Sequence, residues 1–110
     1  MLQNNLVEKK KPHYPLQRVK ELIREGSYRV TRTAIRTAAR DFRLFKSPQL
    51  AGSVLGLTAH DFYKSMTSYD NAKIWQDVYR QEIRGKLAYV KMQIVDETTV
   101  IISFKQVEEA

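Results

Sequence analysis

The feature that most constrains the fold is a change of hydrophobic period near residue 71. Before it, apolar residues recur three and four positions apart, which predicts amphipathic helices. After it, residues 74–83 and 86–95 alternate between apolar and polar, which predicts half-buried strands. Helices followed by meandering strands predict an α+β fold, with the N-terminal helices packed on one side of a small antiparallel sheet.

Four helices are expected, each with a local signal at its start or end. Gly26 is placed to end the first, Thr31 or Thr33 to cap the second, and Pro48 to begin the third. They cover residues 16–25, 32–44, 47–56 and 62 to about 69. The last of these carries Phe62, Tyr63, Lys64 and Met66 after a capping-box-like segment at residues 58–61.

The final hairpin has a register that can be worked out by counting. Apolar residues occupy even positions in both strands, so opposed residues must have an even sum if both sets face the core. A three-residue loop at 96–98 gives a sum of 194 and places Tyr89 opposite Lys105. A five-residue loop places Lys91 opposite Lys105 instead. Either register predicts that Tyr89, Lys91 and Lys105 share the outward face.

Positive charge is concentrated in the first half of the chain. The net charge is +7; residues 1–57 hold twelve Lys or Arg against four Asp or Glu, and residues 58–110 hold seven against eight. Arg32, Arg36 and Arg40 recur every four residues and form one stripe on the second predicted helix. Guanidinium groups bind phosphates bidentately, so the stripe favours a polyanionic partner, although a solvated helix face would look the same.

Several classes of function are disfavoured by what the chain lacks. It contains no cysteine and only two histidines, His13 and His60, which argues against a thiol nucleophile or a metal site. No apolar run is long enough to cross a bilayer, and no secretory signal is evident. We therefore expect a single cytoplasmic domain over residues 1–110 without cofactor, in which residues 1–15 form a flexible basic arm.

Three stretches resemble the MqsR family of toxins. They are DFYKSMT at residues 61–67, WQDVYR at residues 75–80 and SFK at residues 103–105. Similarity in order and spacing extends over roughly residues 11 to 106. The resemblance implies a RelE-like α+β fold, metal-independent endoribonuclease activity on mRNA, and a cognate antitoxin protein that silences the toxin.

The same resemblance assigns active-site roles to four residues. Lys64, Gln76 and Tyr89 match family active-site positions, and Lys105 is the fourth candidate. Register counting had independently placed two of the four on one exposed face. Further RNA contacts are expected from Arg80, Lys91, Arg32, Arg36 and Arg40.

RNA carries its own nucleophile, the ribose 2′-hydroxyl, so the protein needs only a base, a cation and an acid. Tyr89 is expected to act as base or acid, Lys64 and Lys105 to stabilise the transition state, and Gln76 to orient the nucleotide. Tyrosine and lysine ordinarily have pKa values near 10, and we expect neighbouring positive charge to lower them here. The alternatives are a catalytically inactive RNA- or DNA-binding module of the same fold and a regulator that binds only an acidic protein, such as the antitoxin.

Overall fold

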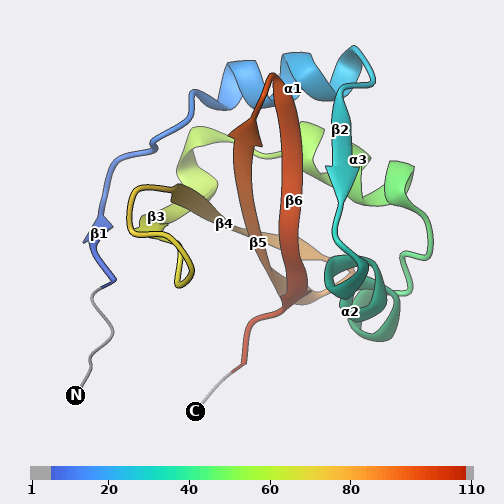
Figure 1. Ribbon diagram of the computed structural model, residues 1–110. Coiled ribbons are helices and arrows are strands. Elements are labelled where there is room, and N and C mark those ends of the chain that lie inside the picture. The colour runs from blue at the N-terminus through green and yellow to red at the C-terminus, as the bar shows by residue number, and fades with distance from the viewer. Residues whose placement is uncertain (1–5, 109–110) are drawn as a thin grey trace.

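A six-stranded sheet, with strand order β1-β3-β4-β5-β6-β2, organises the computed structural model, which describes residues 6–108 (Figure 1). The strands are β1 (Glu8–Lys9), β2 (Tyr28–Val30), β3 (Phe62–Thr67), β4 (Trp75–Ile83), β5 (Lys86–Val95) and β6 (Thr98–Gln106). The helices are α1 (Leu16–Arg24), α2 (Arg32–Phe42), α3 (Ser47–Leu55) and the 3₁₀ turn η1 (Ala59–Asp61). The α+β prediction is confirmed, as are the first three helices.

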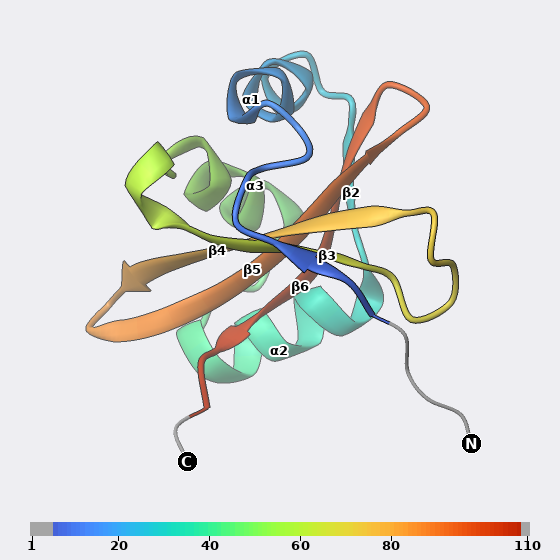
Figure 2. The same cartoon turned by 90° about the vertical axis from the view of Figure 1, so that its left-hand side faces the viewer.

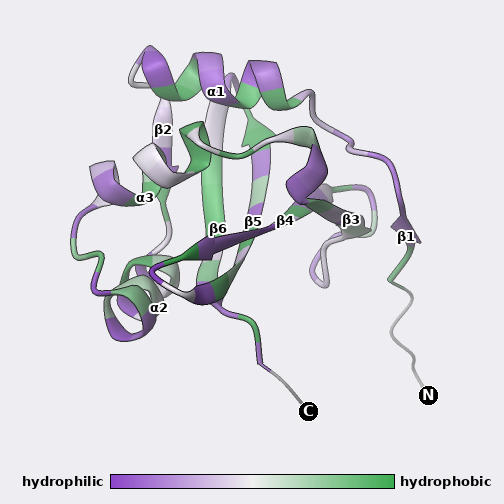
Figure 3. Cartoon of the chain, turned by 180° about the vertical axis from the view of Figure 1, so that it is seen from behind, coloured by the Kyte–Doolittle hydropathy of each residue, from purple (hydrophilic) through white to green (hydrophobic). Residues whose placement is uncertain are grey.

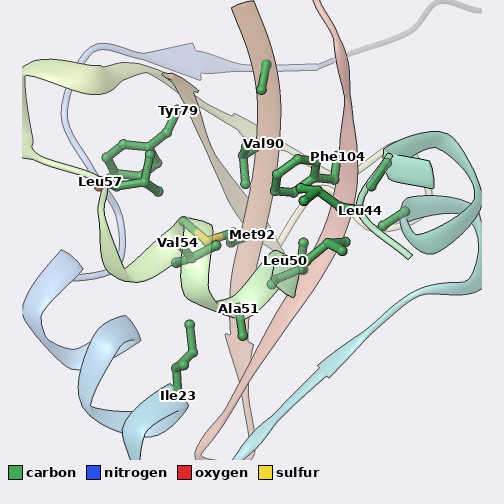
Figure 4. Packing of buried hydrophobic residues seen from close by; sticks show 14 of the residues in the cluster. Ile23, Leu44, Leu50, Ala51, Val54, Leu57, Tyr79, Val90, Met92 and Phe104 are labelled. Atoms are coloured by element: carbon green, nitrogen blue, oxygen red, sulfur yellow. The ribbon is translucent and has the colours of Figure 1, made fainter. Parts of the chain in front are cut away.

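The helices form where the sequence signals them and bury their apolar stripes against the sheet. The Thr31 side chain accepts the backbone N–H of Ala34 and caps α2, and Gly26, at φ 83°, follows the end of α1. Hydrophilic and hydrophobic residues alternate along α1 and α2 (Figure 3). Their apolar faces meet Leu50 of α3 and the even-numbered residues of β5 in one core (Figure 4). None of the described helices could span a membrane.

The prediction of a fourth helix is wrong, because residues 62–67 form strand β3. The capping box exists, since Asp61 accepts the backbone N–H of Thr58 at 2.7 Å, but it caps only the short turn η1. Beyond it, aromatic residues and threonine favour an extended backbone. Pairing with β4 on one side and β1 on the other then decides the structure of this short apolar segment.

The sheet is mixed, so the prediction of a purely antiparallel sheet is wrong at one edge. Residues 28–30 form β2, a strand that the sequence pattern does not predict, and β2 pairs in parallel with β6. The opposite edge is formed by β1, which comes from the predicted arm and lies in front of the other strands in Figure 2. Residues 1–5 of that arm lie outside the described residues.

Asp77 fixes the rest of the arm on the sheet. Its buried carboxylate accepts the backbone N–H of His13 at 3.0 Å and that of Tyr14 at 2.9 Å. Next to Asp77, the His13 ring stacks on the Trp75 ring, with 5.7 Å between the two ring centres. Two members of the WQDVY stretch therefore hold the segment that precedes α1.

The last hairpin, β5 and β6, has the predicted register at Tyr89 and a different register near its turn. Tyr89 pairs with Lys105, as the sum of 194 requires, but Val95 pairs with Thr98. The turn consequently has two residues, Asp96 and Glu97, rather than three, and both have positive φ. A bulge in β6 absorbs the difference and turns Ile101, rather than Ile102, into the core.

Candidate active site

The sheet face opposite the core carries the polar residues that the sequence singled out. Core residues Ala88, Val90 and Met92 alternate along β5 with Tyr89, Lys91 and Gln93, which therefore face away from the helices. Arg80 of β4, Tyr89 of β5 and Lys105 of β6 are direct cross-strand neighbours and form one row. The predicted common face of Tyr89, Lys91 and Lys105 is confirmed.

Lys64 joins this face because of a β-bulge at Tyr63. Phe62 pairs with Tyr79 and packs on the core, so regular alternation would turn Lys64 toward the core as well. The bulge inserts one extra residue and pairs Lys64 with Val78 instead. Val78 in turn pairs with Lys91, which places the two lysines on either side of one small, fully buried residue.

A groove of about 300 Å³ opens over the row. It is lined by Tyr63, Lys64, Arg80, Tyr89, Lys105, Gln106, Val107 and Glu108. The Arg80 guanidinium lies 3.7 Å from the centre of the Tyr63 ring, and the Lys105 ammonium lies 5.4 Å from that of Tyr89. The Nε atom of Arg80 is buried and has no hydrogen-bond partner among the described residues. The groove thus presents three cations and two aromatic rings.

Glu8 of the arm enters this site, which the sequence did not indicate. The Lys64 ammonium donates a hydrogen bond to its carboxylate at 2.5 Å. This bond raises the pKa of Lys64 and lowers that of Glu8, so both stay charged at neutral pH. Tyr63 was also missed, because its bulged position is visible only once β3 is paired with β4.

The expected lowering of pKa values is found at Lys91 but not at Tyr89 or Lys64. Burial raises the pKa of Tyr89, and this outweighs the opposing effect of nearby Lys64. The pKa of Lys64 is also raised, as stated above. Burial, with the charges of Lys105 and Lys64, lowers the pKa of Lys91. The prediction is therefore wrong for Tyr89 and Lys64 and confirmed for Lys91.

Gln76 lies on the same face but does not line the groove. Its side-chain amide donates to Gln93 at 3.1 Å, and the two residues lie four positions along β4 and β5 from Arg80 and Tyr89. Met66 is its partner on β3. Any contact of Gln76 with a ligand would therefore be made beyond the Lys91 position, away from Lys105.

Only one arginine of the α2 stripe comes close to the groove. A second hollow, of about 620 Å³, is lined by Arg40, Asp41, Gln106, Val107 and Glu108 and shares its last three residues with the groove. Arg40 is paired with Asp41 at 2.7 Å. Arg32 and Arg36 are exposed and line neither hollow.

No arrangement of metal ligands stands out in the described part of the chain. Residues 6–108 hold no group of three or more His, Asp or Glu side chains that could bind a metal ion. His13 stacks against Trp75 and His60 is exposed in η1, so neither histidine lines the groove. The groove offers three cations, two phenols and, from Glu108, one carboxylate.

Comparison with known proteins identifies the family of the chain. The family described as "Motility quorum-sensing regulator, toxin of MqsA" matches residues 11–106. The chain belongs to the MqsR toxin family. A curated relative, the mRNA interferase toxin MqsR of Escherichia coli (strain K12), is 38% identical over 100 residues, which cover 91% of this chain and 99% of the relative.

Membership confirms the resemblance inferred from the three sequence stretches. The matched range contains Lys64, Tyr89 and Lys105 together with Arg80 and Lys91. Glu8 precedes it, so the carboxylate that binds Lys64 comes from a part of this MqsR-family chain that the family description does not reach.

Proposed function

We propose that this chain is the toxin of a type II toxin–antitoxin system and cuts mRNA in the cytoplasm as a metal-independent, sequence-selective endoribonuclease. The observation that carries the proposal is the groove in which Lys64, Tyr89 and Lys105 converge from three strands. The name of the E. coli relative, an mRNA interferase toxin, supports mRNA as the substrate. The proposal includes a RelE-like arrangement of the α+β fold.

The chemistry needs only the RNA and the groove. The 2′-oxygen attacks the adjacent phosphorus, a bond from phosphorus to the 5′-oxygen breaks, and a 2′,3′-cyclic phosphate and a 5′-hydroxyl result. The phosphorane formed on the way carries extra negative charge, which the ammonium groups of Lys64 and Lys105 stabilise. Lys64 suits this role because its bond to Glu8 keeps it charged.

Tyr89 is assigned as the proton donor to the leaving 5′-oxygen. Its raised pKa keeps the phenol protonated at neutral pH, which suits an acid and not a base. Its place between Arg80 and Lys105 puts the hydroxyl beside the cations that bind the phosphate. A phenolate formed at that position is stabilised by both neighbours.

The remaining basic residues are assigned to RNA binding. Arg80, whose buried Nε lacks a partner among residues 6–108, is placed to bind a phosphate or a base edge in the groove. Arg40 extends the path toward the second hollow, and Gln76 orients a nucleotide farther along the face. Arg32 and Arg36 contact only RNA that continues along α2.

The partner proposed for this chain is a cognate antitoxin protein, since the family is described as the toxin of MqsA. A toxin that acts on transcripts must be silenced while the cell grows, and a basic surface attracts an acidic or polar binding segment. The +7 charge of the chain agrees with such steering.

The test combines growth with cleavage by purified protein. Expression of the wild type should arrest growth, co-expression with the product of the adjacent gene should restore it, and purified protein should cut RNA in the presence of EDTA. Lys64→Ala should lose at least ~10²-fold in cleavage while still folding. Salt-sensitive RNA binding without cutting would instead identify an inactive binding module, and no RNA binding at low salt a protein-binding regulator.

A further inference from the structure

The proposed reaction also needs a general base that removes the proton from the ribose 2′-hydroxyl, and no residue has yet been assigned to this role. This question rests on the proposed function. Neither histidine lines the groove, Tyr89 is assigned to the leaving group, and Lys64 is held as an ammonium by Glu8. Glu108 lines the groove only at the end shared with the hollow of Arg40, so we expect the base among the other residues on this face.

We infer that Lys91 is the proton acceptor for the 2′-hydroxyl. Lys91 stands two residues from Tyr89 on β5 and is separated from Lys64 only by Val78, its cross-strand partner. Two residues along a strand span about 6.6 Å, a distance that a lysine side chain covers. Lys91 does not itself line the groove, but it shares the face of Lys64 and Tyr89, and its side chain is long enough to reach a ribose bound beside them.

The surroundings of Lys91 favour a neutral amine. Lys64 faces it from β3, Arg80 stands diagonally on β4, and Lys105 stands diagonally on β6. Among the described residues no carboxylate pairs with Lys91, since the Glu8 carboxylate binds Lys64. Burial and the charges of Lys105 and Lys64 lower the pKa of Lys91, whereas the pKa of Tyr89 beside it is raised.

Glu8 is the weaker candidate for this role. Its carboxylate is committed to Lys64, and that bond lowers its pKa, so it accepts a proton poorly. Acid–base catalysis is most effective when the pKa of the group lies near the working pH. An amine whose pKa falls toward neutrality meets this condition better than a carboxylate whose pKa falls away from it.

The step balances with these two groups. The neutral Lys91 amine takes the 2′-hydroxyl proton and becomes an ammonium, while the 2′-oxygen forms its bond to phosphorus. The bond between phosphorus and the 5′-oxygen breaks, and that oxygen takes the phenolic proton of Tyr89. Water then returns the proton from the Lys91 ammonium to the Tyr89 phenolate, and the site is reset.

The first arm of the test is Lys91→Arg, with Lys73→Arg on an exposed loop as the matched control. Arginine has a long side chain with N–H donors but is always protonated, so it cannot accept the proton. We expect Lys91→Arg to bind non-cleavable RNA within about threefold of wild type and to lose about 10²-fold or more in the single-turnover rate. Cleavage by folded Lys91→Arg within threefold of wild type would overturn the inference, because charge alone would then suffice.

The second arm locates the step by changing the substrate. Sulfur in place of the scissile 5′-oxygen gives a leaving group that needs no proton. Cleavage of this substrate should recover in Tyr89→Phe and should remain low in Lys91→Arg. Recovery in Lys91→Arg would place Lys91 at the leaving group and overturn the inference.

The third arm uses the absence of cysteine from the chain. Lys91→Cys can be alkylated with bromoethylamine in urea and refolded, which restores an amine that is slightly more acidic than lysine. We expect activity to return with the rising limb of the pH–rate profile displaced to lower pH, whereas return without displacement would indicate a binding role only. If wild type cuts and these variants behave as wild type, this inference fails alone; if wild type does not cut RNA, the proposed function fails.

Discussion

The carboxylate of Glu8 lies 2.5 Å from the ammonium of Lys64, 56 residues later in the chain. The contact exists because β1 pairs with β3 at the edge of the sheet and because the bulge at Tyr63 turns Lys64 to the same face. It ties the charge state of a proposed catalytic lysine to an arm that lies outside the core.

Glu8→Gln should lower the pKa of Lys64 back toward its ordinary value of 10.5, because the hydrogen bond to the carboxylate is the main cause of the shift. Lys64 then remains protonated at neutral pH, so cleavage at pH 7 should change by less than about threefold. The pKa can be followed by NMR titration of the lysine side chain. Glu21→Gln, on α1, is the control; an unchanged Lys64 pKa would show that the ion pair does not form in solution.

Removing the carboxylate of Asp77 should destabilise the protein and release the segment before α1. Asp77→Ala leaves the backbone N–H groups of His13 and Tyr14 without their acceptor, at a cost of about 1–3 kcal/mol in the free energy of unfolding. Urea denaturation measures the loss, and hydrogen exchange of the two amides reports the release. The matched control is Asp70→Ala at an exposed loop position; equal effects of the two substitutions would contradict this role for Asp77.

Stability at high pH should depend on Tyr79. Burial raises its pKa to about 12, against 10.0 for an ordinary tyrosine. Its contribution is therefore complete below pH 10 and is lost as the pH rises toward 12, because the unfolded phenol ionises first; the loss reaches about 2.7 kcal/mol. Tyr79→Phe should flatten the fall of unfolding free energy between these pH values, whereas Tyr69→Phe, 75% exposed, should not. An unchanged slope in Tyr79→Phe would contradict the assignment.

Lys105 should contribute one phosphate contact to RNA binding. With a 2′-O-methyl oligonucleotide, which cannot be cut, the slope of log affinity against log salt should become shallower by about 0.7 in Lys105→Gln, as expected for one contact to a single strand. Lys73→Gln, on an exposed loop away from the groove, should leave the slope unchanged. A slope unaltered in Lys105→Gln would place the phosphate elsewhere.

Much of the fold followed from periodicity and caps. The two long strands β4 and β5 were predicted because alternation over nine or ten residues has no helical equivalent. β3 was missed because six residues are too few to distinguish the helical period from the alternation of a strand. β2 was missed because its three residues form a strand only by pairing with β6, which is distant in the sequence. The short turn of the last hairpin was missed because two non-glycine residues, Asp96 and Glu97, adopt positive φ.

The site was predictable where alternation alone decides which way a residue faces. Tyr89, Lys91 and Lys105 are such residues, and counting put them on one face. Lys64 reaches them only through a bulge, and Glu8 only through an edge strand of two residues, so neither placement could be derived from local pattern. Charge spacing also misled in part, because the helical register that aligns Arg32, Arg36 and Arg40 does not say which of them reaches the groove.

The most direct measurement is cleavage of two RNA oligonucleotides that differ by one oxygen atom. Both contain the cleavage site mapped with the wild-type protein, and one carries a single 2′-deoxyribose on the 5′ side of the scissile phosphate; both are incubated with pure protein in EDTA. Cleavage of the all-ribose strand into a 2′,3′-cyclic phosphate and a 5′-hydroxyl, with no cleavage of the deoxy strand, is the predicted result. Cleavage of the deoxy strand, or products ending in a 5′-phosphate, would contradict the claim that the ribose supplies the nucleophile.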